Sequence, residues 1–244
     1  MIAGMDEQAK QTGDLGTRSS TDASRRTREA LILAGERLFG EHGIDGVSLR
    51  QINTEAGQRN ASAAHYHFGS KEALINAVWE YRMERVNRRR LEMLTRMEAE
   101  DTQDDLRALV AAIVLPIIEE IQNSDGGSHY IRFMAQVIGH PHISLVDIWN
   151  SRFADGLARV ISLLRAALPD LPSAIIGQRF GLMWEQTIHA LADRERLRAG
   201  NGPDAGIEPE LFVSNLIDTV AGGLGAPISV STRAVLENTN RSGT

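Results

Sequence analysis

The sequence contains no cysteine, which excludes a disulfide framework, a thiolate metal site and a cysteine nucleophile. It also has no long apolar run. The longest, residues 109–118, holds about 10 residues and includes Pro116, whereas a membrane-spanning helix needs about 20. Residues 1–24 are polar and lack the apolar core of a signal peptide. The sequence therefore predicts a soluble, cytoplasmic protein.

Motifs of common enzyme and cofactor sites are also missing. The sequence has no Gly-x-Ser-x-Gly elbow, Walker loop, dinucleotide fingerprint or metal-binding helix motif. His129, His140 and His142 could suggest a metal, but no carboxylate pattern completes a site, so we expect loop histidines. We predict no enzymatic activity, no cofactor and no metal.

Lysine is scarce, since the 26 basic residues include only Lys10 and Lys71 and the others are arginine. The net charge of −6 is unevenly spread. Residues 18–96 hold 14 basic and 10 acidic residues, whereas residues 97–244 hold 11 and 19. A basic front and an acidic back suit a DNA-contacting head on a body that avoids DNA, although a chance fluctuation gives the same pattern.

Helical spacing recurs along the chain, and the two-residue alternation of strands is absent. We predict an all-α protein with an N-terminal three-helix helix-turn-helix domain, followed by a larger helical domain. The expected parts are a disordered arm (1–24), the helix-turn-helix domain (25–70), the larger helical domain (71–225) and a flexible tail (226–244). Helices are expected at about 25–42, 48–56, 60–69, 70–97, 103–123, 128–139, 144–167, 172–199 and 208–224.

The start of the second helix is well marked. Ser48 and Gln51 have the spacing of a capping box, in which the Ser48 hydroxyl accepts from the Gln51 N–H and the Gln51 side chain reaches back. Val47 and Ile52 have the spacing of the matching hydrophobic staple. Gly57 ends the helix. A short helix, a glycine turn and another short helix predict a helix-turn-helix.

The third helix has the composition of a recognition helix. Ala61, Ala63 and Ala64 keep it slim enough for a major groove about 12 Å wide. Polar side chains that can bond DNA are Arg59, Asn60, Ser62, His65 and His67. A polar two-turn helix is equally often plain protein surface. Asn60 is the expected N-cap.

Lys71 favours the DNA-binding alternative. It lies in the first turn of the fourth helix, where the helix dipole disfavours a cation. Together with free backbone N–H groups it would form a phosphate site. A solvated lysine without a role is the other interpretation.

The apolar residues Ile32, Leu38 and Phe39, the segments Val47-Ser48 and Ala56-Gly57, and the run YHFGSKEAL from Tyr66 to Leu74 form a recognisable pattern. With this pattern, residues 26–80 resemble the DNA-binding domain of the tetracycline-repressor (TetR) family of bacterial regulators. The resemblance implies a homodimer on a palindromic operator of double-stranded DNA, usually a repressor released by a small effector. It also implies that the larger helical domain (71–225) is the effector-binding and dimerisation domain. By position it implies that Arg50 contacts the backbone or a base, that His67 reaches a base or a phosphate, and that Lys71 clamps a phosphate.

One feature departs from the family pattern. The segment from Gly57 to Phe68 is one residue longer than usual, and His65 stands where a phosphate-binding tyrosine is common, with Tyr66 following it. Which of Arg59, Asn60, Ser62 and Ala63 contacts bases is therefore left open. The predicted DNA-binding residues are Ser48, Arg50, Arg59, Asn60, Ser62, His65, Tyr66, His67 and Lys71.

The back half is rich in aromatic and methionine residues and poor in charge around them. This composition predicts an apolar effector pocket, although an ordinary core has the same composition. The expected lining residues are Phe133, Met134, Trp149, Phe153, Met183, Trp184, Gln186 and His189. The last two long helices resemble the dimerising four-helix bundle of the family, with an expected interface of Phe180, Ile188, Leu191, Phe212, Leu216, Ile217 and Val220.

Two other classes of function stay open at this point. An enzyme in the helical back half would show turnover that survives deletion of residues 1–70. A helical adaptor that acts only through protein contacts would show no salt-dependent binding to DNA. The sequence favours the regulator and leaves its operator, effector and regulated genes unspecified.

Overall fold

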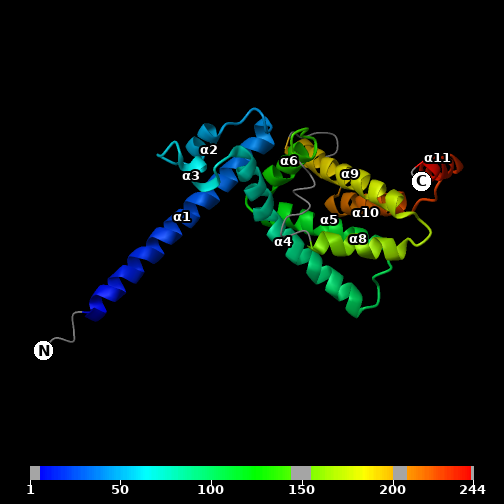
Figure 1. Cartoon of the computed structure of the whole chain (residues 1–244), viewed down its shortest axis with the longest axis horizontal. Coiled ribbons are helices and arrows are strands. Elements are labelled where there is room, and N and C mark those ends of the chain that lie inside the picture. The colour runs from blue at the N-terminus through cyan, green and yellow to red at the C-terminus, as the bar shows by residue number, and fades with distance from the viewer. Residues whose placement is uncertain (1–5, 144–154, 200–207, 243–244) are drawn as a thin grey trace. The chain divides into compact units, whose positions relative to one another are not determined.

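A computed structural model of the chain describes residues 6–143, 155–199 and 208–242 (Figure 1). Within these residues the secondary structure is helical and contains no strand, so the all-α prediction is confirmed. The helices are α1 (Asp6–His42), α2 (Leu49–Glu55), α3 (Ala63–Phe68), α4 (Lys71–Ala99), α5 (Leu106–Asn123), α6 (Gly127–Ile138), α8 (Asp155–Ala167), α9 (Ser173–Ala199), α10 (Pro209–Gly225) and α11 (Val230–Ser242).

The chain forms two compact units whose boundary lies inside helices. Unit 1 comprises Met1–Arg82 and His129–Ile148, and unit 2 comprises Met83–Ser128 and Trp149–Thr244. The first turns of α4 and most of α6 therefore belong to unit 1. The sequence-based boundary at residue 70 differs, because long-range packing of this kind leaves no mark in local sequence patterns.

Unit 1 has a core that α1 shares with α2, α3, α4 and α6. Its fully or nearly fully buried apolar side chains include Leu31, Ile32, Phe39, Ile44, Val47, Ile52, Leu74, Val78, Phe133 and Met134. The rings of Phe39 in α1 and Phe133 in α6 lie with their centroids 6.2 Å apart. Gly40 permits this approach, since a Cβ atom there would lie 2.8 Å from the carbonyl oxygen of His129.

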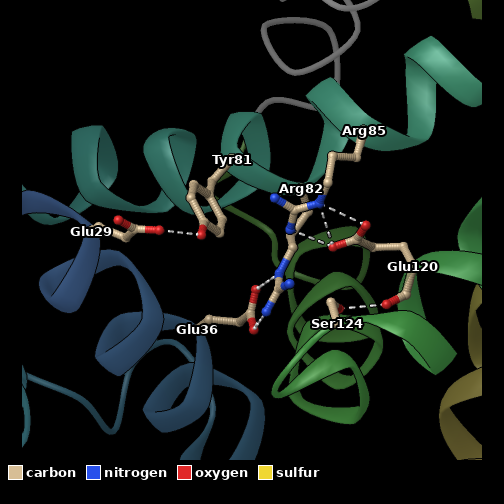
Figure 2. A network of polar contacts seen from close by, with 7 residues as sticks. All are labelled: Glu29, Glu36, Tyr81, Arg82, Arg85, Glu120 and Ser124. Atoms are coloured by element: carbon tan, nitrogen blue, oxygen red, sulfur yellow. Dashed lines mark hydrogen bonds and ion pairs between the residues drawn. The ribbon is translucent and has the colours of Figure 1, made fainter. Parts of the chain in front are cut away.

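A buried ion pair joins α4 to α1 within unit 1. The Arg82 guanidinium donates two hydrogen bonds of 2.7 Å each to the Glu36 carboxylate, and both side chains are only 2% exposed (Figure 2). One position earlier, the Tyr81 hydroxyl donates to Glu29 at 2.6 Å. Arg82 also lies 6.0 Å from the ring centroid of Tyr130 in α6. Two charges that are removed from water in this way need each other, because a lone buried charge is very costly.

Unit 2 is built from the remainder of α4 together with α5, α8, α9, α10 and α11. Arg85 and Arg89 of α4 form ion pairs with Glu120 and Glu119 of α5, at 2.6 Å and 2.7 Å; Figure 2 shows the first of these pairs. Buried apolar side chains of its core include Leu109, Ile113, Ile117, Val160, Leu164, Ile176, Met183, Ile188, Ile217 and Val220.

Pro116 leaves a gap in the hydrogen bonding of α5, and Arg90 fills it. A proline inside a helix has no N–H to donate to the carbonyl group four residues earlier, which here is that of Ala112. The Nε–H of the buried Arg90 donates to this carbonyl oxygen at 3.2 Å. A side chain of α4 thus replaces the missing backbone donor of α5.

The two ends of the chain differ from the expectation of an arm and a tail. α1 begins at Asp6 rather than near residue 25, and α11 occupies most of the segment after residue 226. Ser229 caps α11, since its hydroxyl accepts from the Thr232 N–H at 3.2 Å. Residues 21–26 and 229–235 have exposed side chains, so core packing does not account for the helix at these positions.

The described helices include none that by itself is long and apolar enough to cross a bilayer. α10 and α11 pass that test only when they are taken together, as a pair bent by 52°.

Removing one partner of the buried ion pair should destabilise unit 1. Arg82→Met leaves Glu36 buried without its cation, and we expect a loss of about 3–5 kcal/mol in unfolding free energy. Arg37→Gln is the matched control, because Arg37 pairs with Glu55 at the surface, where such a pair contributes about 0–1 kcal/mol. Urea unfolding followed by circular dichroism measures both changes. Equal small losses in the two variants would contradict the assigned role.

A double-mutant cycle tests the replacement of the proline's missing donor. Arg90→Met should cost about 1–3 kcal/mol, because the buried Ala112 carbonyl loses its donor. Pro116→Ala restores a backbone N–H to that carbonyl, so Arg90→Met should cost at least about 1 kcal/mol less in the Pro116→Ala background. Thermal unfolding of the four proteins gives the coupling. Strictly additive effects would rule out the shared hydrogen-bond acceptor.

Candidate nucleic-acid interface

α2 begins as the sequence predicts. The Gln51 N–H donates to the Ser48 hydroxyl at 3.3 Å, and the Ser48 N–H donates to the Gln51 side-chain oxygen at 2.8 Å. Val47 and Ile52, the expected hydrophobic staple, are both buried. The capping box is therefore confirmed, and Ser48 and Arg50 lie exposed at the start of α2.

The turn after α2 holds its extra residue with hydrogen bonds of its own. Gly57 adopts a φ of +67°, a conformation that glycine accepts without strain, and the Gln58 N–H donates to the Asn53 carbonyl at 2.9 Å. The Asn60 side-chain oxygen accepts from the Ser62 N–H at 2.9 Å, as in an Asx turn. The prediction that Asn60 caps the third helix is therefore wrong. α3 begins at Ala63 with Ser62 at its N-cap.

Asn53 braces the turn from inside, a role that was not predicted from the sequence. This residue of α2 is 2% exposed. Its amide nitrogen donates to the Ala61 carbonyl at 2.6 Å, and its side-chain oxygen accepts from the Ala64 N–H at 2.8 Å. One side chain thus fixes the end of the turn and the first residues of α3. The available signal was an asparagine beside Ile52 on the buried side of a short amphipathic helix.

α3 is divided into a buried side and an exposed side. Ala63 and Ala64 pack inside, whereas His65 is exposed and Tyr66 is 82% exposed. The half-buried His67 packs edge-on against the Tyr66 ring, with centroids 5.2 Å apart. The other predicted DNA-binding residues of this region, Arg59, Asn60 and Ser62, are exposed in the turn just before the helix.

Lys71 lies at the start of α4, half-buried, with its Nζ 5.9 Å from the ring centroid of Phe39. Some of the backbone N–H groups at this helix start, which were expected to be free for a phosphate, already have acceptors within the chain. The Ser70 hydroxyl accepts from the Ala73 N–H at 3.1 Å. The pKa of Glu72 is lowered because its carboxylate accepts hydrogen bonds from its own backbone N–H and from Ser70. A phosphate here would therefore be bound by the Lys71 side chain rather than by an open helix end.

The predicted effector residues are not gathered in one unit. Phe133 and Met134 are fully buried in the core of unit 1. Met183 and Trp184 are buried on α9 of unit 2, where Gln186 and His189 are exposed. Trp149 and Phe153 lie outside the residues that the structure describes. The aromatic composition thus reflects two separate cores at the described positions.

The residues predicted for the dimer interface are mostly inside the single chain. Phe180, Ile188, Leu191, Leu216, Ile217 and Val220 are each 7% exposed or less. Phe212 is half-buried, with the Arg194 guanidinium 4.2 Å from its ring centroid. These side chains therefore pack within unit 2 of the single chain.

A groove between α5 and α10 has a volume of about 330 Å³ within unit 2. Its apolar floor includes Leu115, Ile118, Val213 and Ile217, and its polar rim includes Arg107, Glu119, Gln122 and Ser214. Arg107 is held at the rim by hydrogen bonds to Asp218 and Ser214. The groove was not predicted from the sequence, because its lining comes from segments about 100 residues apart.

The histidines considered as metal ligands have other partners. His140 Nε2 lies 3.2 Å from a carboxylate oxygen of Asp45, and His129 lies in α6 rather than in a loop, 3.5 Å from Glu41. Burial lowers the pKa of His129. Among the described residues, no cluster of three or more His, Cys, Asp or Glu side chains could hold a metal ion.

A short capped helix, a braced glycine turn and a second short helix with an exposed polar side define a helix-turn-helix protein. Residues 31–78 match the family model described as bacterial regulatory proteins, tetR family. Residues 111–223 match a second model, described as the C-terminal domain of tetracyclin repressor-like proteins. The chain belongs to the TetR family of bacterial regulators.

One sequence relative and two solved structures are similar to this chain, and the structures show likeness of fold. The chain is 34% identical over 103 residues to the HTH-type transcriptional repressor NicS of Pseudomonas putida, an alignment of 42% of this chain and 46% of that protein. A TetR family transcription regulator from Marinobacter aquaeolei has a similar fold, with a TM-score of 0.58, 13% identity, and coverage of 83% of this chain and 97% of that one. The fold is also similar to that of NalD of Pseudomonas aeruginosa, a secondary repressor of a multidrug efflux pump. The TM-score is 0.52 and the identity 20%, with coverage of 82% of this chain and 97% of that one.

Replacing Asn53 should loosen the turn. Asn53→Ala leaves the Ala61 carbonyl and the Ala64 N–H without their partner, at about 1–3 kcal/mol for each group. Thr54→Ala, which removes an exposed hydroxyl from the next position, is the control and should cost far less. Urea unfolding compares the two, and a variant Asn53→Ala as stable as the wild type would disprove the bracing role.

Proposed function

We propose that this protein is a sequence-specific transcriptional repressor, which binds a palindromic DNA operator as a homodimer and leaves it when a small apolar effector binds. The observation that carries the proposal is the two-sided character of α3. Ala63 and Ala64 pack inside while His65 and Tyr66 project outward. A narrow helix of this kind can enter the major groove and present hydrogen-bonding groups to base edges.

The other predicted contacts divide by chemistry. Arg59, Asn60 and Ser62 are exposed beside the N-terminal end of α3, from which recognition helices contact bases. Ser48 and Arg50 at the start of α2, and Lys71 at the start of α4, suit the phosphate backbone on either side. Because Asn60 already bonds the Ser62 N–H through its oxygen, its side-chain N–H₂ group is the part that can donate to DNA.

The homodimer would use the exposed sides of α9 and α10. On α9, Gly177 is exposed, Gly181 is half-buried and Leu182 is 67% exposed; on α10, Gly222 and Gly223 are exposed. A Cβ atom added at any of these four glycines would meet no atom within 4 Å. Small residues of this kind let helices from two copies approach closely.

The effector would bind in unit 2, where the groove between α5 and α10 offers an apolar floor. A volume of about 330 Å³ matches the lower end of known small-molecule sites. The relatives NicS and NalD are described as repressors, which supports this direction of regulation. We further propose that the protein acts in the cytoplasm without catalysing a reaction or carrying a cofactor, in line with its family.

Loss of the Lys71 charge should weaken DNA binding at every sequence. Lys71→Ala removes one phosphate contact, so the slope of log affinity against log salt should fall by about one. Lys71→Arg keeps the charge and should keep the slope, while Arg165→Gln removes an exposed charge from unit 2 and should have little effect. Fluorescence anisotropy on a duplex selected by the wild type measures this. A wild type without any salt-dependent DNA binding would overturn the proposed function.

A further inference from the structure

Three arginines lie on α1 just before the segment that matches the family model. Arg25, Arg26 and Arg28 are exposed, and the model match begins only at residue 31. Residues 18–28 contain four arginines and a single acid, Asp22, so this stretch of α1 is strongly basic in a chain whose net charge is −6. Asp22 is 3.6 Å from Arg25 at the surface, where such a pair is weak.

Helical spacing places Arg25 and Arg28 on the side of α1 that faces the helix-turn-helix. Residues 25, 28, 32 and 39 are separated by three, four and seven positions, so they share one side of α1. Ile32 and Phe39 of this series are buried in the core that α1 shares with the other helices of unit 1. Arg25 and Arg28 therefore extend the inward side of α1 beyond the end of that core.

A direct contact ties Arg28 to the recognition helix. Its guanidinium carbon lies 5.1 Å from the ring centroid of Phe68, the last residue of α3. The neighbouring ring of His67 lies 6.2 Å from that of Phe68, and Lys71 follows three residues later. An arginine stacked on an aromatic ring is held in place while its N–H groups stay available for bonding.

We propose that Arg25, Arg26 and Arg28 form a second DNA-contacting surface, which binds backbone phosphates next to the base pairs reached by α3. This inference rests on the proposed DNA-binding function and extends it to residues outside the family's helix-turn-helix. The ligand chemistry is that of double-stranded DNA phosphates, for which arginine is well suited because its planar N–H groups match phosphate oxygens. The contact adds affinity and positions α3, and it does not read sequence.

The test compares two variants with the same net charge. In the first, Arg25, Arg26 and Arg28 are all replaced by Gln, a good helix former. In the second, the exposed Arg88, Arg165 and Arg233 of unit 2 are replaced in the same way. Anisotropy titrations over a range of salt concentrations use a long duplex that contains the sequence selected by the wild type, and the same duplex trimmed to its half-sites.

The first variant should lose about 0.9 in salt slope for each phosphate contact removed, and the second should keep the wild-type slope. Trimming the flanks should weaken the wild type by about tenfold and leave the first variant almost unchanged. Arg25→Gln with Arg26→Gln, which spares the Arg28–Phe68 contact, guards against a folding defect. If the wild type binds DNA but both triple variants share its slope, the second surface is disproved. If the wild type binds no duplex, the proposed function itself fails.

Discussion

A buried ion pair between Arg82 of α4 and Glu36 of α1 joins these two helices in unit 1, and neither charge could stay buried without the other. Arg82 and Glu36 are both almost completely buried. Their two parallel hydrogen bonds form only when α1 and α4 have one particular position relative to each other. α2 and α3, with 7 and 6 residues, are too short to be stable alone and take their orientation from this frame. The exposed side of α3 is therefore aimed by an ion pair formed elsewhere in the same unit.

The arginines of α4 change what the charge distribution means. In the sequence they contribute to a basic front half, which suggests a positive DNA-contacting surface. In the structure Arg82, Arg85 and Arg89 are each paired with a glutamate of α1 or α5, and Arg90 bonds a backbone carbonyl. They hold the protein together rather than attract DNA. The positive charge available near α3 comes instead from α1, from the turn before α3 and from Lys71.

Features set by neighbouring residues could be predicted from the sequence, and features set by distant ones could not. The capping box at Ser48, the glycine turn and the exposed side of α3 follow from spacing within a few residues. Asn53 was missed because its partners are backbone groups 8 and 11 residues away. The sequence predicts Phe133 in an effector pocket and Ile188 in a dimer interface, whereas the structure buries each of them in the core of its own unit. Composition alone does not tell which neighbour buries an apolar side chain.

The brace provided by Asn53 has a consequence for how such a protein can diverge. Both of its hydrogen bonds go to backbone atoms, so they are indifferent to the side chains carried by residues 58–62. Two of those positions also use their side chains within the turn, since Asn60 accepts from the Ser62 N–H and Gln58 donates to the Ala56 carbonyl. The brace therefore tolerates exchange at the exposed positions Arg59 and Ser62, while the chain keeps its path into α3. Under the proposed function, relatives that keep this brace would read different operators by changing these two side chains.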